Sequence, residues 1–136
     1  MEFLLTNSIT FLSIFKKYAI NTPRRIAHFL AQLHEESGGF IKFTESLNYT
    51  PQGLIKTFGT NQISVAQANQ YGRTAKQKAN QQAIANIVYG GRIGNDTFND
   101  GWKFRGRGAL QTTGKNNYRL LGDFLGVNLV SDPNPV

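Results

Sequence analysis

Three carboxylates stand close together in a part of the chain that could support acid–base chemistry. Glu35, Glu36 and Glu45 fall within eleven residues, and the next acidic residue after them is Asp96. The chain as a whole is basic, with 15 Lys and Arg against 8 Asp and Glu and a formal net charge of +7. An acidic cluster in a basic protein is a candidate for a general acid and a general base.

The periodicity before the first two carboxylates predicts an amphipathic helix that begins at Thr22-Pro23 and ends at Gly38-Gly39. On a helical wheel Glu35 falls almost opposite the apolar face, whereas Glu36 lies about 70° from its centre. Glu36 is therefore expected at the edge of the core, where partial burial and the negative helix end both disfavour its charged form. The alternative is a glutamate at a helix end that points into water.

Glu45 follows Glu36 across the two glycines, Gly38 and Gly39. On one continuous helix these two carboxylates would point in opposite directions, but the glycines allow the chain to reverse. The second carboxylate can then face the first across a cleft. A shielded carboxyl group paired with one in a polar loop is the arrangement that glycoside hydrolysis uses, and spacing alone does not distinguish retention from inversion.

The sequence gives little support for a metal site or for thiol chemistry. His34 and Glu35 begin an H-E-x-x-H pattern, but position 38 is Gly, so the second histidine ligand is missing. His28 is expected to be an ordinary helix-surface or core-edge residue. There are no cysteines, which excludes disulfides, thiolate zinc sites and cysteine nucleophiles. We expect neither a metal nor a cofactor.

The elements that must position these groups are mostly helical. The 136 residues, 40% of them hydrophobic, fit one globular domain over 1–136. We expect no more than a minor β element, a short strand around Trp102 and Phe104, within a long Gly-rich loop. Capping residues, glycines and apolar spacing predict helices over 8–20, 22–37, 51–58, 64–71, 74–89 and 115–125.

Four ordered blocks of the chain resemble glycoside hydrolase family 19, most closely the branch found in bacteriophage endolysins and bacterial chitinase-like proteins. The first block is similar to the H-E-S-G-G-F signature of that family, and the last block, which includes Gly-Arg-Gly, is the strongest match. In chain order the blocks are LAQLHEESGGF (30–40), ESLNYT (45–50), ANIVYGGRIGN (85–95) and DGWKFRGRGALQTTGKNNY (100–118).

The resemblance implies a lysozyme-like, bilobal, α-rich fold with a sugar-binding cleft and an inverting mechanism that needs no metal. It implies that Glu36 is the general acid, that Glu45 is the general base, and that the Thr113 hydroxyl positions the attacking water. The positions that the resemblance assigns to the cleft or its wall are Gln111, Asn117, Tyr49, Asn86 and Arg92.

Two departures from the family pattern stand out. Many relatives carry His immediately before the catalytic Glu, whereas here that position is Glu35 and the histidine comes one residue earlier. Family domains also usually continue for several helices beyond the Asp-Pro turn, so we expect a catalytic domain truncated at its C-terminus.

The Gly-rich loop alternates the basic residues Lys103, Arg105 and Arg107 with Trp102 and Phe104. One interpretation is a basic rim that attracts an anionic polymer, with Arg105 binding substrate and Trp102 stacking on a sugar ring. That favours peptidoglycan over neutral chitin. The alternative is structural, with the arginines holding the loop to backbone carbonyls and Trp102 filling the core. No phosphate-binding loop, helix-turn-helix or basic region indicates nucleic-acid binding.

The hypothesis is therefore a cell-wall glycosidase that hydrolyses β-1,4 bonds between N-acetylated amino sugars of peptidoglycan. The alternatives are a chitinase and a non-catalytic carbohydrate-binding remnant. The apolar stretch over 3–15 is too short and too polar to span a membrane and lacks the basic start of a signal peptide. We expect a monomer without membrane insertion, cytoplasmic until released to the cell wall, as in phage or prophage lysis.

Overall fold

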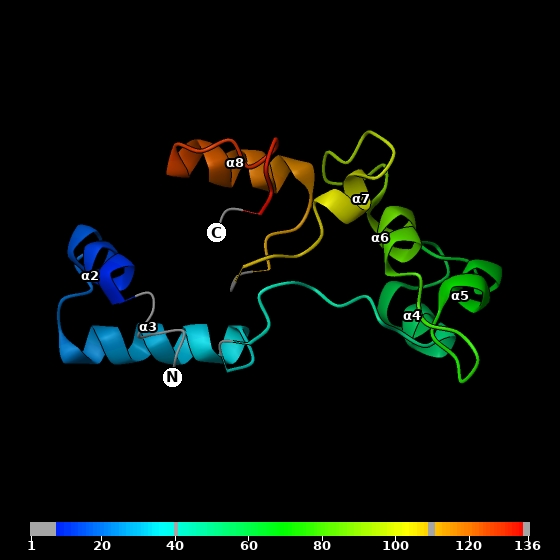
Figure 1. Ribbon diagram of the computed structural model, residues 1–136, viewed down its shortest axis with the longest axis horizontal. Helices are drawn as coiled ribbons and strands as arrows, with labels where there is room; N and C mark the ends of the chain where they lie inside the picture. Colours follow the sequence, from blue (N-terminus) through cyan, green and yellow to red (C-terminus); the bar gives the residue numbers. More distant parts are fainter. Residues whose placement is uncertain (1–7, 40, 109–110, 135–136) are drawn as a thin grey trace. The chain divides into compact units, whose positions relative to one another are not determined.

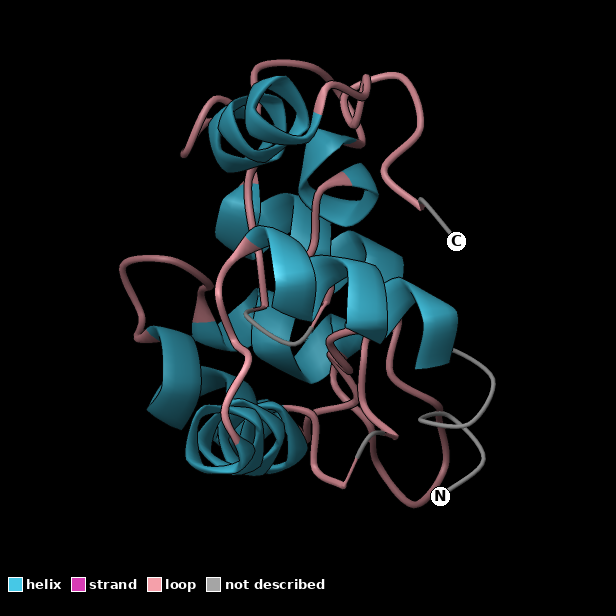
Figure 2. Ribbon diagram, turned by 90° about the vertical axis from the view of Figure 1, so that its left-hand side faces the viewer, coloured by secondary structure: helices cyan, strands magenta, loops and turns pink. Residues whose placement is uncertain are grey.

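Helices make up nearly all of the regular structure in the computed structural model, which describes residues 8–39, 41–108 and 111–134. Figures 1 and 2 show these helices joined by loops, and the predicted mainly α class is confirmed. The chain divides into two compact units, the first comprising residues 1–43 and 108–110 and the second residues 44–107 and 111–136. The single-domain assignment stays a prediction. Over the described ranges, no helix is long and apolar enough to cross a membrane.

The first unit is built on two helices, α2 (Ser8–Lys17) and α3 (Pro23–Glu36). Phe11 and Phe15 of α2 lie with Phe29 of α3 in an aromatic cluster whose ring centroids are 5.5–6.4 Å apart. Both pairings with Phe29 are edge-to-face, the geometry that aromatic quadrupoles favour. This cluster explains why the apolar periodicity of the two segments produces a helix pair.

Helix α3 begins and ends where the sequence predicts. The Thr22 side chain accepts a hydrogen bond from the backbone N–H of Arg25, and Pro23 occupies the first turn, where no backbone donor is needed. At the other end the Ser37 hydroxyl donates to the carbonyl of Leu33 at 2.6 Å. Gly38 and Gly39 follow with φ of 56° and 82°, the left-handed backbone that glycine adopts without strain.

The second unit contains the other five helices of the described chain: α4 (Pro51–Phe58), α5 (Val65–Tyr71), α6 (Gln81–Tyr89), α7 (Asp100–Lys103) and α8 (Lys115–Leu125). Helices α4 to α7 pack against one another in chain order (Figure 1). Their apolar faces enclose the main core, formed by Leu47, Leu54, Ile63, Ala68, Ile84, Ala85 and Val88. Phe104, Tyr118 and Leu129 form a second buried cluster.

Two predicted helices are shorter than expected. The helix predicted over 8–20 ends at Lys17. The prediction over 74–89 is wrong for its first part, because α6 begins only at Gln81. The Thr74 hydroxyl accepts from the backbone N–H groups of Lys76 and Gln77, which makes a local turn that competes with a helix. The Asn80 side chain then accepts from the N–H of Ala83 and caps α6.

The predicted strand at Trp102 and Phe104 is also wrong, because residues 100–103 form the short helix α7. Two contacts outside this segment favour the helix. The Asn86 side chain accepts from the backbone N–H of Trp102 at 2.8 Å, and Gly101 lies directly against the backbone in the middle of α6. Among the described residues, the β pairing is limited to isolated bridges of Arg107 with Thr44 and Thr112.

The close contact between α6 and α7 provides a stability test. A Cβ at Gly101 would lie 2.4 Å from the Ala85 carbonyl oxygen and 2.8 Å from Asn86 Cα. Both are backbone atoms, so the helices would have to move apart to accommodate it. Gly101→Ala should therefore lower the free energy of unfolding by about 1–3 kcal/mol in urea denaturation. The exposed control Asn69→Ala in α5 should change it by less than about 0.5 kcal/mol. Equal stability of both variants would show that the helices do not pack this closely.

Candidate active site

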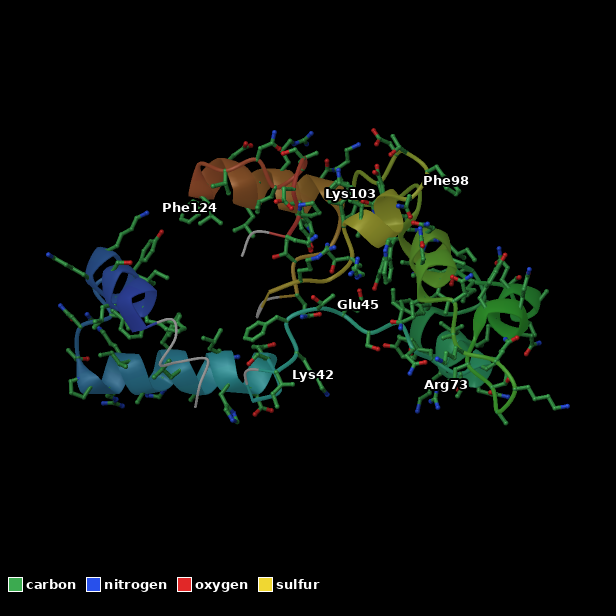
Figure 3. The ribbon with its side chains drawn as sticks, in the orientation of Figure 1. Lys42, Glu45, Arg73, Phe98, Lys103 and Phe124 are labelled. Atoms are coloured by element: carbon green, nitrogen blue, oxygen red, sulfur yellow. The ribbon has the colours of Figure 1, made fainter. Side chains whose placement is uncertain are left out.

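Glu45 is positioned by backbone pairing between two segments that are far apart in the sequence. It lies in the extended segment that leads into α4 (Figure 3), and its N–H donates to the carbonyl of Gly106 at 2.8 Å. The neighbouring residue Thr44 forms an antiparallel bridge with Arg107. The loop after α7 therefore fixes the backbone on which the carboxylate stands.

Both oxygens of the Glu45 carboxylate accept hydrogen bonds. The Tyr89 hydroxyl at the end of α6 donates to Oε1 at 2.5 Å, and the backbone N–H of Gly106 donates to Oε2 at 3.1 Å. Burial raises the pKa of Tyr89, and the hydrogen bond and negative charge of Glu45 raise it further. The phenol thus stays a donor, and both Glu45 oxygens act as acceptors, as the oxygen of a general base also does.

The predicted cleft residue Gln111 lies beside this carboxylate. A Cβ built on Gly106 would lie 2.9 Å from Gln111 Oε1 and 3.3 Å from Glu45 Oε2. Both side-chain oxygens therefore lie close to the Cα of Gly106. Glycine at position 106 leaves the space that the two side chains occupy. The structure therefore brings the side chains of Glu45 and Gln111 close together, and a cleft role for Gln111 stays a prediction.

The predicted Thr113 and Asn117 lie at the start of α8. The Thr113 hydroxyl donates to the carbonyl of Gln111 at 2.9 Å, and the Asn117 side-chain amide donates to the carbonyl of Thr113 at 2.8 Å. With its proton engaged in this way, the hydroxyl oxygen of Thr113 has lone pairs with which to accept a hydrogen bond from a water. The three predicted residues Gln111, Thr113 and Asn117 form one hydrogen-bonded run.

The loop arginines take the structural role that the sequence left open. Arg105 donates to the carbonyl of Trp102 at 2.9 Å and lies over the Trp102 ring, 3.7 Å from its centroid. Arg107 donates to the carbonyl of Lys103 and to the Tyr118 hydroxyl. Both arginines are half-buried and engaged inside the loop, and substrate binding by Arg105 stays a prediction.

Trp102 is also placed as the structural alternative describes. Its ring packs against the main core and carries the Arg105 guanidinium. A sugar ring would need an uncovered aromatic face, so the packing favours the core role.

The remaining predicted cleft-wall residues lie around α6 and the main core. Asn86 joins α6 to α7 through hydrogen bonds with Trp102 and Asn99. Arg92 is exposed and donates to the carbonyl of Val88 at 3.1 Å. Tyr49 is half-buried against the main core, with its ring edge-to-face on Phe58. Their contact with a substrate stays a prediction.

Glu36 belongs to the first unit, and its surroundings differ from the expectation. Its side chain is exposed rather than partly shielded, as is that of Glu35. The Gln32 side-chain amide, one turn earlier in α3, donates to Glu36 Oε1 at 2.8 Å. Within α3 no residue is buried, so the helix supplies no core edge at this position. The general-acid role of Glu36 stays a prediction from the resemblance.

The sequence analysis did not single out Asp100, whose carboxylate accepts hydrogen bonds within the loop between α6 and α8. Burial by itself would raise its pKa, but hydrogen bonds from Thr97 and Lys115 lower the pKa of Asp100 to about 2. Lys115 Nζ lies 3.2 Å from Asp100 Oδ2 and 2.5 Å from Asp96 Oδ1. The ammonium group thus occupies the place between two carboxylates where a cation would bind. Across the described ranges, no group of three or more His, Cys, Asp or Glu side chains could hold a metal.

Tyr89 and Gly106 are the site residues that sequence reasoning missed. Both lie inside the blocks that resemble the family, but neither has a spacing that relates it to Glu45. A tyrosine at the end of a helical run, directly before Gly90-Gly91, was the only signal that the sequence carried.

These features define a mainly helical protein with a hydrogen-bonded carboxylate suited to acid–base chemistry. The chain is similar to a glycosyl hydrolase family 19 domain-containing protein of Haemophilus influenzae, with 45% identity over 102 residues. The predicted resemblance to glycoside hydrolase family 19 is thereby confirmed. The match covers 74% of this chain and 48% of the relative, so the chain spans about half the length of the relative. No protein-family model matches the chain.

The ion pair at Asp100 predicts a specific pH dependence of stability. The pKa of Asp100 is lower in the folded protein, about 2, than the ordinary value of 3.8. Its ionised form therefore stabilises the fold above about pH 4, and this contribution is lost as the pH falls toward 2. Asp100→Asn should lower the free energy of unfolding at pH 7 and should reduce its loss between pH 4 and 2, measured by urea denaturation.

The control for this test replaces an exposed aspartate in α8. Asp123→Asn should leave the free energy of unfolding at pH 7 within about 0.5 kcal/mol of the wild-type value. Parallel stability curves for wild type and Asp100→Asn over pH 2–4 would contradict the assignment of a stabilising carboxylate at position 100.

Proposed function

We propose that this chain is a glycosidase of the chitinase or lysozyme type. The observation that carries the proposal is the Glu45 carboxylate, held as a hydrogen-bond acceptor by Tyr89 and Gly106 beside Gln111. The same residue is the general base that the family resemblance implies. The similarity to a protein named for its glycosyl hydrolase family 19 domain supports the reaction class.

The proposed reaction is a single inverting displacement. Glu45 takes a proton from a water molecule, which the Thr113 hydroxyl orients. The water oxygen bonds to the anomeric carbon as the glycosidic C–O bond breaks. Glu36 gives its proton to the leaving oxygen, and one water is consumed. Afterwards Glu45 releases its added proton to solvent and Glu36 takes one up, which restores both groups. No metal or cofactor takes part.

For the substrate we propose peptidoglycan, cleaved at β-1,4 bonds between N-acetylated amino sugars. The net charge of +7 supports an anionic polymer. Arg105 and Arg107 no longer add to that argument, because both are held by partners within their own loop. Chitin, a neutral polymer of the same kind of sugar, is therefore the second candidate. Monomeric state and release from the cytoplasm to the cell wall stay predictions.

The two carboxylates provide the direct test. Purified chain is incubated with peptidoglycan sacculi and, separately, with chitin oligosaccharides, and the soluble products are identified by mass spectrometry. Glu36→Gln and Glu45→Gln should each lower the rate by about 100-fold or more, because each removes a proton-transfer group. Glu35→Gln is the matched control: it removes the neighbouring exposed carboxylate and should keep most of the activity.

Each outcome of this experiment decides a different part of the proposal. Hydrated reducing ends released from sacculi support peptidoglycan hydrolysis, and release that weakens as salt rises supports recognition of an anionic polymer. Products from chitin alone would replace the substrate but keep the mechanism. Anhydro ends would overturn the role of Glu45 as base. A folded chain that binds either polymer and releases nothing would be a carbohydrate-binding protein, not an enzyme.

A further inference from the structure

We propose that Tyr89 is a positioning residue that holds the Glu45 carboxylate in the orientation that proton transfer requires. This inference rests on the proposed function, in which Glu45 is the general base. Its basis is the hydrogen bond of 2.5 Å from the Tyr89 hydroxyl to Glu45 Oε1, joining residues 44 positions apart.

The hydroxyl acts together with the backbone to restrict the carboxylate. Tyr89 binds Oε1, and the Gly106 N–H binds Oε2 at 3.1 Å, so rotation of the carboxylate would break both bonds. Each oxygen keeps a further lone pair after these bonds are made. The arrangement therefore fixes the direction of the remaining acceptor sites without consuming them, which a base that must meet one particular water requires.

Tyr89 is itself held from two sides. Its ring packs edge-to-face against Phe58 with a centroid distance of 6.1 Å, and its carbonyl accepts from the Asn95 side chain at 2.9 Å. Asn95 is only 1% exposed, and its side-chain oxygen accepts from the backbone N–H of Lys115 at 3.0 Å. A hydrogen-bonded chain thus runs from the start of α8 through Asn95 and Tyr89 to Glu45.

The charged and titratable groups around this pair leave Tyr89 as the donor. Tyr49 lies near it on the core side, and burial with the charge of Glu45 keeps the pKa of Tyr89 well above its ordinary value. Arg105 in the loop and Tyr118 in α8 interact electrostatically with Glu45. Burial and the charge of Arg107 lower the pKa of Arg105, which Tyr118 and Glu45 partly offset. The Tyr89 hydroxyl therefore remains the donor to Glu45.

The kinetic test compares Tyr89→Phe with a matched tyrosine. Phenylalanine keeps the ring and removes only the donor. Loss of this hydrogen bond leaves Oε1 of Glu45 without its protein donor, so the carboxylate is less often in the orientation that proton transfer needs. At the pH optimum kcat should fall about 10-fold with KM little changed. Tyr71→Phe, on the same core but with no hydroxyl hydrogen bond in the described structure, should leave both unchanged.

A second measurement does not depend on activity. A short hydrogen bond of this kind should give a downfield hydroxyl proton resonance that is absent in Tyr89→Phe and displaced in Glu45→Gln. If the wild-type chain hydrolyses neither polymer, the proposed function fails, and this resonance still decides whether Tyr89 and Glu45 are bonded. An unchanged kcat in a folded Tyr89→Phe would overturn the proposal. So would the absence of the resonance from the wild-type chain.

Discussion

The backbone pairing between the segment at Glu45 and the loop at Gly106 is the constraint on which the second unit depends. It joins residues 61 positions apart through two hydrogen bonds, one from each backbone N–H. The second of these bonds ends on the Glu45 carboxylate itself. As a result, the conformation of a Gly-rich loop and the orientation of a charged side chain are determined by the same contact, and neither can change alone.

Close backbone approaches make that contact possible. Gly101 lets α7 lie against the middle of α6, and Gly106 leaves room for the side chains of Glu45 and Gln111. Hydrogen bonds from polar side chains add to this packing. Asn86 joins α6 to α7, and Asn95 joins the end of α6 to the start of α8. A buried amide that satisfies two backbone groups is costly to replace, because its loss leaves both unpaired.

The net charge of +7 suggests attraction of an anionic partner, but several of the positive side chains make contacts within the protein. Arg105 and Arg107 are held by backbone carbonyls, and Lys115 lies between two aspartates. The catalytic proposal therefore depends less on attraction of a polymer by the loop than on one oriented carboxylate. A base of this kind works through position and hydrogen bonding, which the phenol of Tyr89 and a backbone amide supply here.

The sequence by itself determined the helical class, most helix ends and the family resemblance. These depend on local signals such as Thr22 before Pro23, Thr50 before Pro51 and glycines after apolar runs. It failed at 74–80 and at 100–103, where the Thr74 turn and contacts with Asn86 outweigh local periodicity. It also could not relate Tyr89 to Glu45 or predict the exposure of Glu36. Only the tertiary structure decided these points, because hydrogen bonds and burial depend on residues that are distant in sequence.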